Sequence, residues 1–206
     1  MSSINPIRNQ EQDWLLTPKN CGLVVIDYQP TQIHSVNSME TSKLIKNISI
    51  VAQAAKIYHL PIVLSTVNVR TTRNQETIEP LKSILKDLPS YDRTSINAWE
   101  DQETYDAIKQ MKRDKLVMCA LWTEACLTYP ALDALQEGYE VYAIVDAVGG
   151  TTNLAHETAL RRLEQAGVKL ISIAQFICEL QRDWNRQDSV EEFLDIMFEL
   201  GAFVGQ

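Results

Sequence analysis

Cys126 and Asp27 are the residues of this sequence whose types and positions could perform covalent chemistry. Cys126 lies five residues beyond the apolar run 116–121, and Asp27 directly follows the small and apolar run 22–26. A cysteine thiolate can attack a carbonyl carbon, and a carboxylate can take the thiol proton and pass it to a leaving group. The pair therefore indicates acyl-transfer chemistry with a cysteine nucleophile.

The surroundings of each residue leave a second interpretation open. Thr123 can cap a helix that places Cys126 in its first turn, where unpaired N–H groups and the helix dipole favour a thiolate and could hold an oxyanion. Free cysteine is, however, commonly a small buried residue. Asp27 could likewise serve only the turn that follows its strand. The two positions together favour function over packing.

The remaining cysteines and histidines give weaker signals. Cys21, Cys119 and Cys178 lie in or beside apolar segments without CxxC spacing, so we expect reduced, buried thiols. The three histidines show no HExxH or paired spacing, and His156 is expected to cap or pack within its helix. No GxGxxG, P-loop or GxSxG motif is present. We therefore expect no metal and no cofactor.

Alternating strand and helix patterns must position these residues. The segments that read as strands are 21–27, 61–66, 115–121, 139–146 and 168–173. The segments with helical periodicity are 41–59, 101–111, 124–137 and 155–166. This order predicts an α/β fold with a doubly wound, mostly parallel sheet and helices on both faces. In such folds ligands bind beyond the carboxyl ends of the strands, where Asp27 and Cys126 are expected.

Composition and charge exclude several classes of function. The chain has 206 residues, 45% of them hydrophobic and 22% charged, which suits one domain over 1–206 with its core at about 16–184. The formal net charge of −8 gives no basic surface for nucleic acid, and no apolar run is long enough for a membrane span. We expect a cytoplasmic protein. An amphipathic helix in the tail 185–206 could pack on its own core or on a neighbouring subunit.

Several motifs together resemble the isochorismatase-like cysteine hydrolase family. They are the aspartate that ends the first strand, an apolar strand running into TEAC, and the stretch YPALDALQEGYEVYAIVDAVGG. The resemblance extends from Leu16 to Trp184. RTSINAWED and CELQRDW are most similar to the YcaC-type subgroup of bacterial hydrolases.

The resemblance implies a three-layer, Rossmann-like sheet of about six strands and a set of catalytic roles. Cys126 matches the family's nucleophile and Asp27 its proton-transferring aspartate. Trp122 and Thr123 match the point where relatives carry a cis peptide bond. The backbone N–H groups of Ala125 and Cys126 are then expected to hold the oxyanion.

Three further residues complete the predicted site. Arg93 stands where relatives carry the catalytic lysine, and an arginine holds its charge but cannot release a proton. Gln29 and Trp99 are expected to line the substrate pocket together with Trp122. Nicotinamidases of the family bind a metal through an aspartate and histidines after the second strand, but this chain reads STVNVRTTRNQ there and lacks those ligands.

The sequence thus predicts a metal-independent hydrolase for a small amide or carbamoyl C–N bond, acting through a thioester. Its partners would be a small-molecule substrate and further copies of the chain, since the family commonly forms tetramers or octamers. Two alternatives stay open. One is a catalytically impaired, oligomeric binding or scaffold protein with an unreactive Cys126. The other is a thiol redox sensor that forms a sulfenic acid or mixed disulfide.

Overall fold

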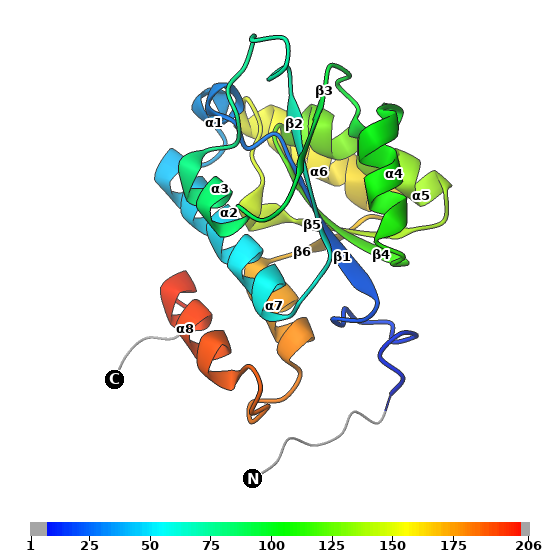
Figure 1. Ribbon diagram of the computed structural model, residues 1–206, viewed down its shortest axis with the longest axis vertical. Helices are drawn as coiled ribbons and strands as arrows, with labels where there is room; N and C mark the ends of the chain where they lie inside the picture. Colours follow the sequence, from blue (N-terminus) through cyan, green and yellow to red (C-terminus); the bar gives the residue numbers. More distant parts are fainter. Residues whose placement is uncertain (1–7, 203–206) are drawn as a thin grey trace.

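The protein folds around a six-stranded parallel sheet, seen in a computed structural model that describes residues 8–202 (Figure 1). The strand order is β3-β2-β1-β4-β5-β6, and all neighbouring strands run parallel. The strands are β1 (Cys21–Ile26), β2 (Ile62–Val67), β3 (Ser90–Arg93), β4 (Lys115–Ala120), β5 (Glu140–Ile144) and β6 (Lys169–Ile171).

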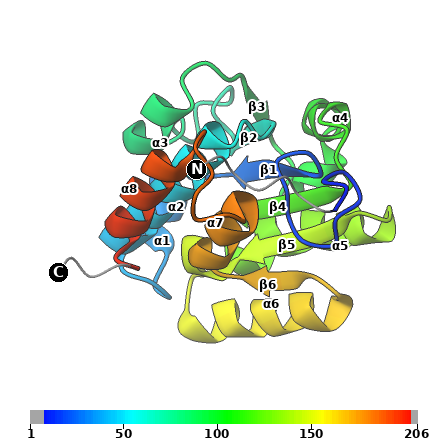
Figure 2. The ribbon, with the colours of Figure 1, turned by 90° about the horizontal axis from the view of Figure 1, so that it is seen from below.

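Helices cover both faces of the sheet (Figure 2). The α-helices are α1 (Pro30–Ser35), α2 (Thr41–Ile57), α3 (Glu79–Ile84), α4 (Gln102–Gln110), α5 (Thr128–Gln136), α6 (Asn153–Ala166), α7 (Ile173–Gln181) and α8 (Val190–Leu200). The shorter helical turns are η1 (Ala98–Glu100), η2 (Thr123–Leu127) and η3 (Val145–Ala147). Helices α2, α3, α7 and α8 pack together on one face, and α4, α5 and α6 lie on the other.

The doubly wound fold predicted from the sequence is confirmed, and all five expected strands are present. The order of the strands reverses between β1 and β4, where Ile26 pairs in register with Ala120. On its other side Ile26 pairs with Ser65 of β2. Residues that follow these strands therefore meet at one edge of the sheet, which is where doubly wound folds bind ligands. The strand β3 was expected only through the family resemblance, because its four residues are too few and too polar to show a strand pattern.

Local capping explains where the predicted helices begin. Asp101 is the N-cap of α4, because its carboxylate accepts from the Thr104 N–H at 2.9 Å. Thr152 caps α6 in the same way, accepting from the Ala155 N–H at 3.0 Å. After β4 the expected single helix is divided into a π-helical turn, η2, and α5.

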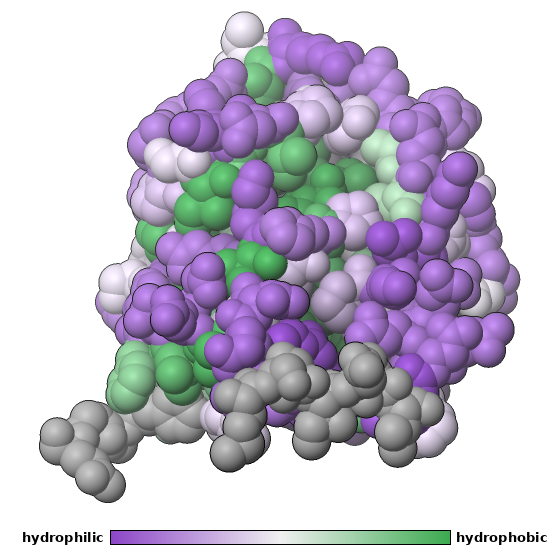
Figure 3. All heavy atoms as spheres, turned by 60° about the horizontal axis from the view of Figure 1, so that its bottom comes forward, coloured by the Kyte–Doolittle hydropathy of each residue, from purple (hydrophilic) through white to green (hydrophobic). Residues whose placement is uncertain are grey.

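The tail helix α8 packs on the core of its own chain, as one of the two alternatives from the sequence expected. Its buried residues Phe193, Ile196 and Met197 join the main core beside α2 and α7. Its outer side exposes Phe198 at 52%. Figure 3 shows hydrophobic side chains gathered at the lower left of the molecule. Within residues 8–202, no helix combines the length and apolar character that a membrane span requires.

Candidate active site

A buried ion pair between Asp27 and Arg93 forms the base of the site. Arg93 Nη1 donates to Asp27 Oδ1 and Nη2 to Oδ2, both at 2.7 Å, and neither side chain has exposed surface. Two parallel charge-assisted hydrogen bonds of this kind fix the plane of the carboxylate. Asp27 has a positive φ of 63°, directly after β1, and Arg93 ends β3. The pair thus spans β2, which separates the two strands.

Arg93 is held by further acceptors at the strand ends. Nη1 also donates to Ser65 Oγ at 3.2 Å and to the Thr66 carbonyl at 3.1 Å, and Nη2 donates to the Ile96 carbonyl at 3.2 Å. Burial alone would lower the pKa of Arg93, but the hydrogen bonds and charge of Asp27 raise it above its ordinary value. The guanidinium therefore stays charged and cannot act as an acid or base.

Cys126 lies beside this pair with only 8% of its surface exposed. Burial, followed by the negative charge of Asp27 and a hydrogen bond to it, raises the pKa of Cys126 from 9.0 to about 12. The charge of Arg93 and the Trp122 backbone N–H act in the opposite direction and are outweighed. Burial and Asp27 together therefore favour a neutral resting thiol over the helix-stabilised thiolate expected from the sequence.

The turn that carries Cys126 begins at a cis peptide bond between Leu121 and Trp122. This bond lies one residue before the Trp122–Thr123 step expected from the resemblance. It is the Trp122 backbone N–H that reaches the Cys126 sulfur. The Ala125 N–H is occupied by the Trp122 carbonyl at 3.2 Å, as is the Leu127 N–H at 3.2 Å. The Ala125 N–H is thus engaged within the turn rather than directed toward Cys126.

Thr123 joins this turn to the loop before α6. Its N–H donates to the Gly149 carbonyl at 2.9 Å, and its Oγ1 lies 2.8 Å from His156 Nδ1. It makes no side-chain capping bond, contrary to the expectation, because Trp122 is the residue at the N-cap position. Burial lowers the pKa of His156 below its ordinary value, so the imidazole is neutral at pH 7.

Glu124 makes the second link to the same loop. Its Oε1 accepts from both the N–H of Thr151, at 2.9 Å, and the Thr151 hydroxyl, at 2.6 Å. Its Oε2 is buried and has no partner among the described residues. Gly150 lies against this carboxylate, since a Cβ there would be 2.6 Å from Glu124 Oε2. Glu124, Gly150 and His156 were not predicted as supports of the turn, and the paired glycines 149–150 were the available signal in the sequence.

Two predicted pocket residues have structural roles instead. Both N–H groups of the Gln29 amide are used, by the Val67 carbonyl at 3.0 Å and the Gln75 carbonyl at 2.6 Å, and its oxygen accepts from the Val67 N–H. Gln29 therefore holds the loop after β2. Trp99 bonds Glu137 and packs edge-on against Tyr139, at the amino end of β5. Cys126 follows the carboxyl end of β4, so Trp99 is placed at the opposite edge of the sheet.

Trp122 is the aromatic residue that the structure brings to the site. It contributes the peptide bond before the nucleophile turn, and its indole N–H donates to Ser35 Oγ at 2.8 Å. Among the other predicted thiols, Cys21 and Cys119 are buried as expected. Cys178 is exposed, because it lies on the side of α7 away from the buried Ile177 and Phe176.

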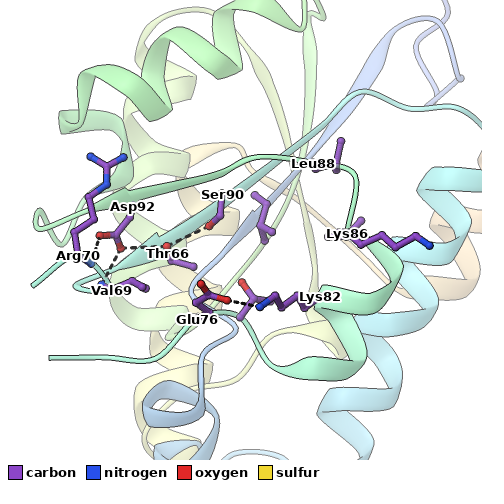
Figure 4. A pocket seen from close by; sticks show the side chains of 12 residues that line it. Thr66, Val69, Arg70, Glu76, Lys82, Lys86, Leu88, Ser90 and Asp92 are labelled. Atoms are coloured by element: carbon purple, nitrogen blue, oxygen red, sulfur yellow. Dashed lines mark hydrogen bonds and ion pairs between the residues drawn. The ribbon is translucent and has the colours of Figure 1, made fainter. Parts of the chain in front are cut away.

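Neither a group of metal ligands nor the cavity beside β2 and β3 marks this site among the described residues. The part of the chain between residues 8 and 202 contains no group of three His, Cys, Asp or Glu side chains that could hold a metal ion. A cavity of about 430 Å³ lies between α3 and the β2–β3 edge (Figure 4). Its polar wall includes Thr66, Ser90 and Asp92, and the Lys82–Glu76 ion pair lies across it from them. The cavity is on the other side of the strands from Ser65 and Arg93, so it is separate from the Cys126 site.

Known proteins are similar to this chain in both sequence and fold. Residues 21–175 match the family model described as Isochorismatase domain. The probable hydrolase YcaC of Escherichia coli strain K12 is 31% identical over 82% of this chain and 81% of its own length. The structure of YcaC from Pseudomonas aeruginosa with hexane-2,5-diol and covalent acrylamide aligns with a TM-score of 0.86 and 26% identity, over 92% of this chain and 93% of that one.

A second solved structure agrees with these matches. The Escherichia coli YcaC gene product, described as an octameric hydrolase of unknown specificity, aligns with a TM-score of 0.81 at 26% identity, over 93% of this chain and 98% of that one. The family model covers most of the chain and includes Asp27, Arg93 and Cys126. The chain therefore belongs to the isochorismatase family of hydrolases.

Proposed function

We propose that the protein is a cysteine hydrolase that cleaves a small amide, carbamoyl or related C–N bond through a thioester, without a metal. The observation that carries this proposal is the buried, doubly hydrogen-bonded Asp27–Arg93 pair beside the Cys126 thiol. A buried thiol that is hydrogen-bonded to a fixed carboxylate has a general base in place before substrate arrives. The segment 65–75 offers no carboxylate or imidazole for a metal-assisted alternative.

The first half of the reaction forms the thioester. Asp27 takes the proton of Cys126 as the sulfur attacks the substrate carbonyl carbon, because a thiol with a pKa of about 12 supplies almost no free thiolate at pH 7. Backbone N–H groups of the nucleophile turn, that of Cys126 among them, stabilise the oxyanion. Asp27 then gives the proton to the leaving nitrogen as the C–N bond breaks.

The second half restores the enzyme. Asp27 removes a proton from water as the water oxygen attacks the thioester carbon, and the proton returns to the sulfur when the C–S bond breaks. Arg93 keeps the carboxylate oriented throughout and compensates its charge. Each Asp27 oxygen bonded to Arg93 keeps a second lone pair for the proton. The covalent acrylamide of the Pseudomonas YcaC structure supports a reactive nucleophile in this fold, in contact with a small amide.

Ammonia release tests this proposal directly. We would assay a panel of small primary amides and carbamoyl compounds with the wild-type protein, Cys126→Ser and Asp27→Asn, and search for an acyl adduct on Cys126 by mass spectrometry. Release of ammonia by the wild type alone supports the mechanism. Equal release by Cys126→Ser would remove the nucleophile from it.

The raised pKa of Cys126 favours a second candidate, an oligomeric binding or scaffold protein of the same fold. This candidate predicts that no compound of the panel is hydrolysed and that acrylamide leaves Cys126 unmodified in the native protein. The redox sensor is disfavoured by the same pKa, since such sensors use easily ionised thiols.

Homo-oligomerisation is part of the proposal, and the octameric Escherichia coli relative supports it. The cytoplasmic location and the lack of nucleic-acid binding stay predictions.

A further inference from the structure

Three large hydrophobic side chains are exposed around the nucleophile turn. Ile96 is 63% exposed, Leu154 75% and Tyr129 39%. They come from the segment after β3 and from the first turns of α6 and α5. We call the surface that they form the 96–154 face; it lies on the side of the sheet covered by α4, α5 and α6 (Figure 2). Exposed apolar side chains that gather in one place commonly mark an interaction site.

The 96–154 face is hollowed as well as apolar. Ile96 and Tyr129 border a hollow of about 400 Å³, and Leu154 borders a second of about 350 Å³. Arg162 of α6 lines both, so the two hollows adjoin. Projecting side chains therefore alternate with recesses on one continuous surface. A surface of this shape can receive a second copy of itself about a two-fold axis, because each projection then meets a recess.

Charged side chains on the face could also pair with those of a second copy about a two-fold axis. Arg162 and Glu100 both line the first hollow, yet neither forms an ion pair with any residue between 8 and 202. Asp133 lines the same hollow but already accepts a hydrogen bond from the Asn97 amide at 2.6 Å, which leaves Glu100 as the acidic partner for Arg162. Arg162 and Glu100 can satisfy each other twice across a two-fold axis. A partner of uniform charge would satisfy only one of them.

We propose that the 96–154 face is the two-fold interface between copies of this chain. Arg162 of one protomer pairs there with Glu100 of its partner, and Leu154 enters the partner's hollow. The inference rests on the proposed homo-oligomer and specifies the surface that builds it. It also joins assembly to the active site, because the Ile96 carbonyl accepts from Arg93 Nη2 and Tyr129 follows Cys126 by three residues.

Molecular mass in solution tests the interface. We would measure native mass spectra and light scattering for the wild type, Leu154→Asp and Ile96→Asp, with Phe198→Asp as the matched control on exposed apolar surface of α8. A buried charge at the centre of an interface weakens association about thirtyfold or more. We therefore expect the two face variants to dissociate into smaller species at concentrations where the control keeps the wild-type mass.

A charge-reversal cycle gives an independent readout. Arg162→Glu and Glu100→Arg should each weaken assembly, and the double variant should restore it, which a change in folding alone cannot do. Wild-type mass for both face variants, or dissociation of Phe198→Asp alone, would overturn the proposed interface. A monomeric wild type would overturn the oligomer as well, but ammonia release would still decide the hydrolase proposal.

Discussion

Asp27 has two opposing effects on Cys126 in this site. It supplies the general base, but, together with burial, its charge and hydrogen bond raise the pKa of the Cys126 thiol. The chemistry therefore depends on proton transfer during attack rather than on a preformed thiolate. Arginine in place of the family's lysine fits this arrangement, because the proton moves between Cys126 and Asp27 and Arg93 only has to hold the carboxylate.

Asp27→Asn should make Cys126 more reactive toward alkylation while it abolishes turnover. The substitution removes the charge and the carboxylate that raise the Cys126 pKa and leaves Arg93, which lowers it. Burial, the largest cause of the raised pKa, remains, so the pKa should fall below about 12 but stay above that of a solvent-exposed thiol. At pH 7 the thiolate fraction, and with it the alkylation rate, should rise at least about tenfold. The pH dependence of iodoacetamide labelling, resolved by peptide mapping, measures this change.

One control and one stability measurement accompany this experiment. Ser65→Ala removes one contact of Arg93 at 3.2 Å but keeps the ion pair, so its labelling profile should match the wild type. Asp27→Asn should also cost about 3 to 5 kcal/mol of stability, because it leaves the Arg93 charge buried and unpaired. An unchanged Cys126 pKa in Asp27→Asn would show that Asp27 does not control the thiol.

At the scale of elements, the nucleophile turn is positioned by its neighbours rather than by its own sequence. Thr123 and Glu124 tie η2 to the loop 149–152, and the Trp122 indole ties it to Ser35 at the end of α1. These contacts join segments that are far apart in the chain. They explain why the sequence predicted the nucleophile but not its supports.

Gly150→Ala should impair activity through this contact between loops. A Cβ at this position would lie 2.6 Å from Glu124 Oε2 and 3.1 Å from the His156 Cα. The clash should cost about 1 to 3 kcal/mol of folding stability and displace η2. Turnover should therefore fall by more than the loss of folded protein explains. Gly138→Ala is the control, since its φ of 89° makes alanine unfavourable there but its Cβ would meet open space. Folding stability should fall in both variants. The activity of the protein that remains folded should fall only in Gly150→Ala.

Gln29→Ala tests the role that the structure assigns to this buried amide. Three hydrogen bonds from its side chain hold the backbone of Val67 and Gln75. Their loss leaves buried backbone groups unpaired, so we expect about 2 to 3 kcal/mol of destabilisation. Amide hydrogen exchange should become faster in the segment 67–75 and stay unchanged in α6. Unchanged exchange in 67–75, with a raised KM, would return Gln29 to the substrate-binding role predicted from the sequence.

At the scale of the whole molecule, the elements that could be predicted from the sequence are those with a strong hydrophobic pattern. The buried strands β1 and β4 and the long helix α2 were predicted because each shows an uninterrupted apolar run or an apolar face. The polar strand β3 has no such signal, and its edge position is set by pairing with β2. The pKa of Cys126 was misjudged because it depends on burial and on Asp27, which lies 99 residues away along the chain.

The C-terminal helix α8 is part of the hydrophobic core, although the core predicted from the sequence ended at residue 184. Phe193 is 1% exposed and packs in the same core as α2 and α7, so Phe193→Ala should cost about 3 to 5 kcal/mol. Phe198→Ala, five residues further along α8, changes a side chain that is 52% exposed and should cost clearly less than Phe193→Ala. Urea denaturation of the two variants measures the difference. Equal midpoints would mean that α8 is an appendage on a core that is already complete, whereas a single cooperative transition shifted only in Phe193→Ala places the tail within the folding unit that holds the active site.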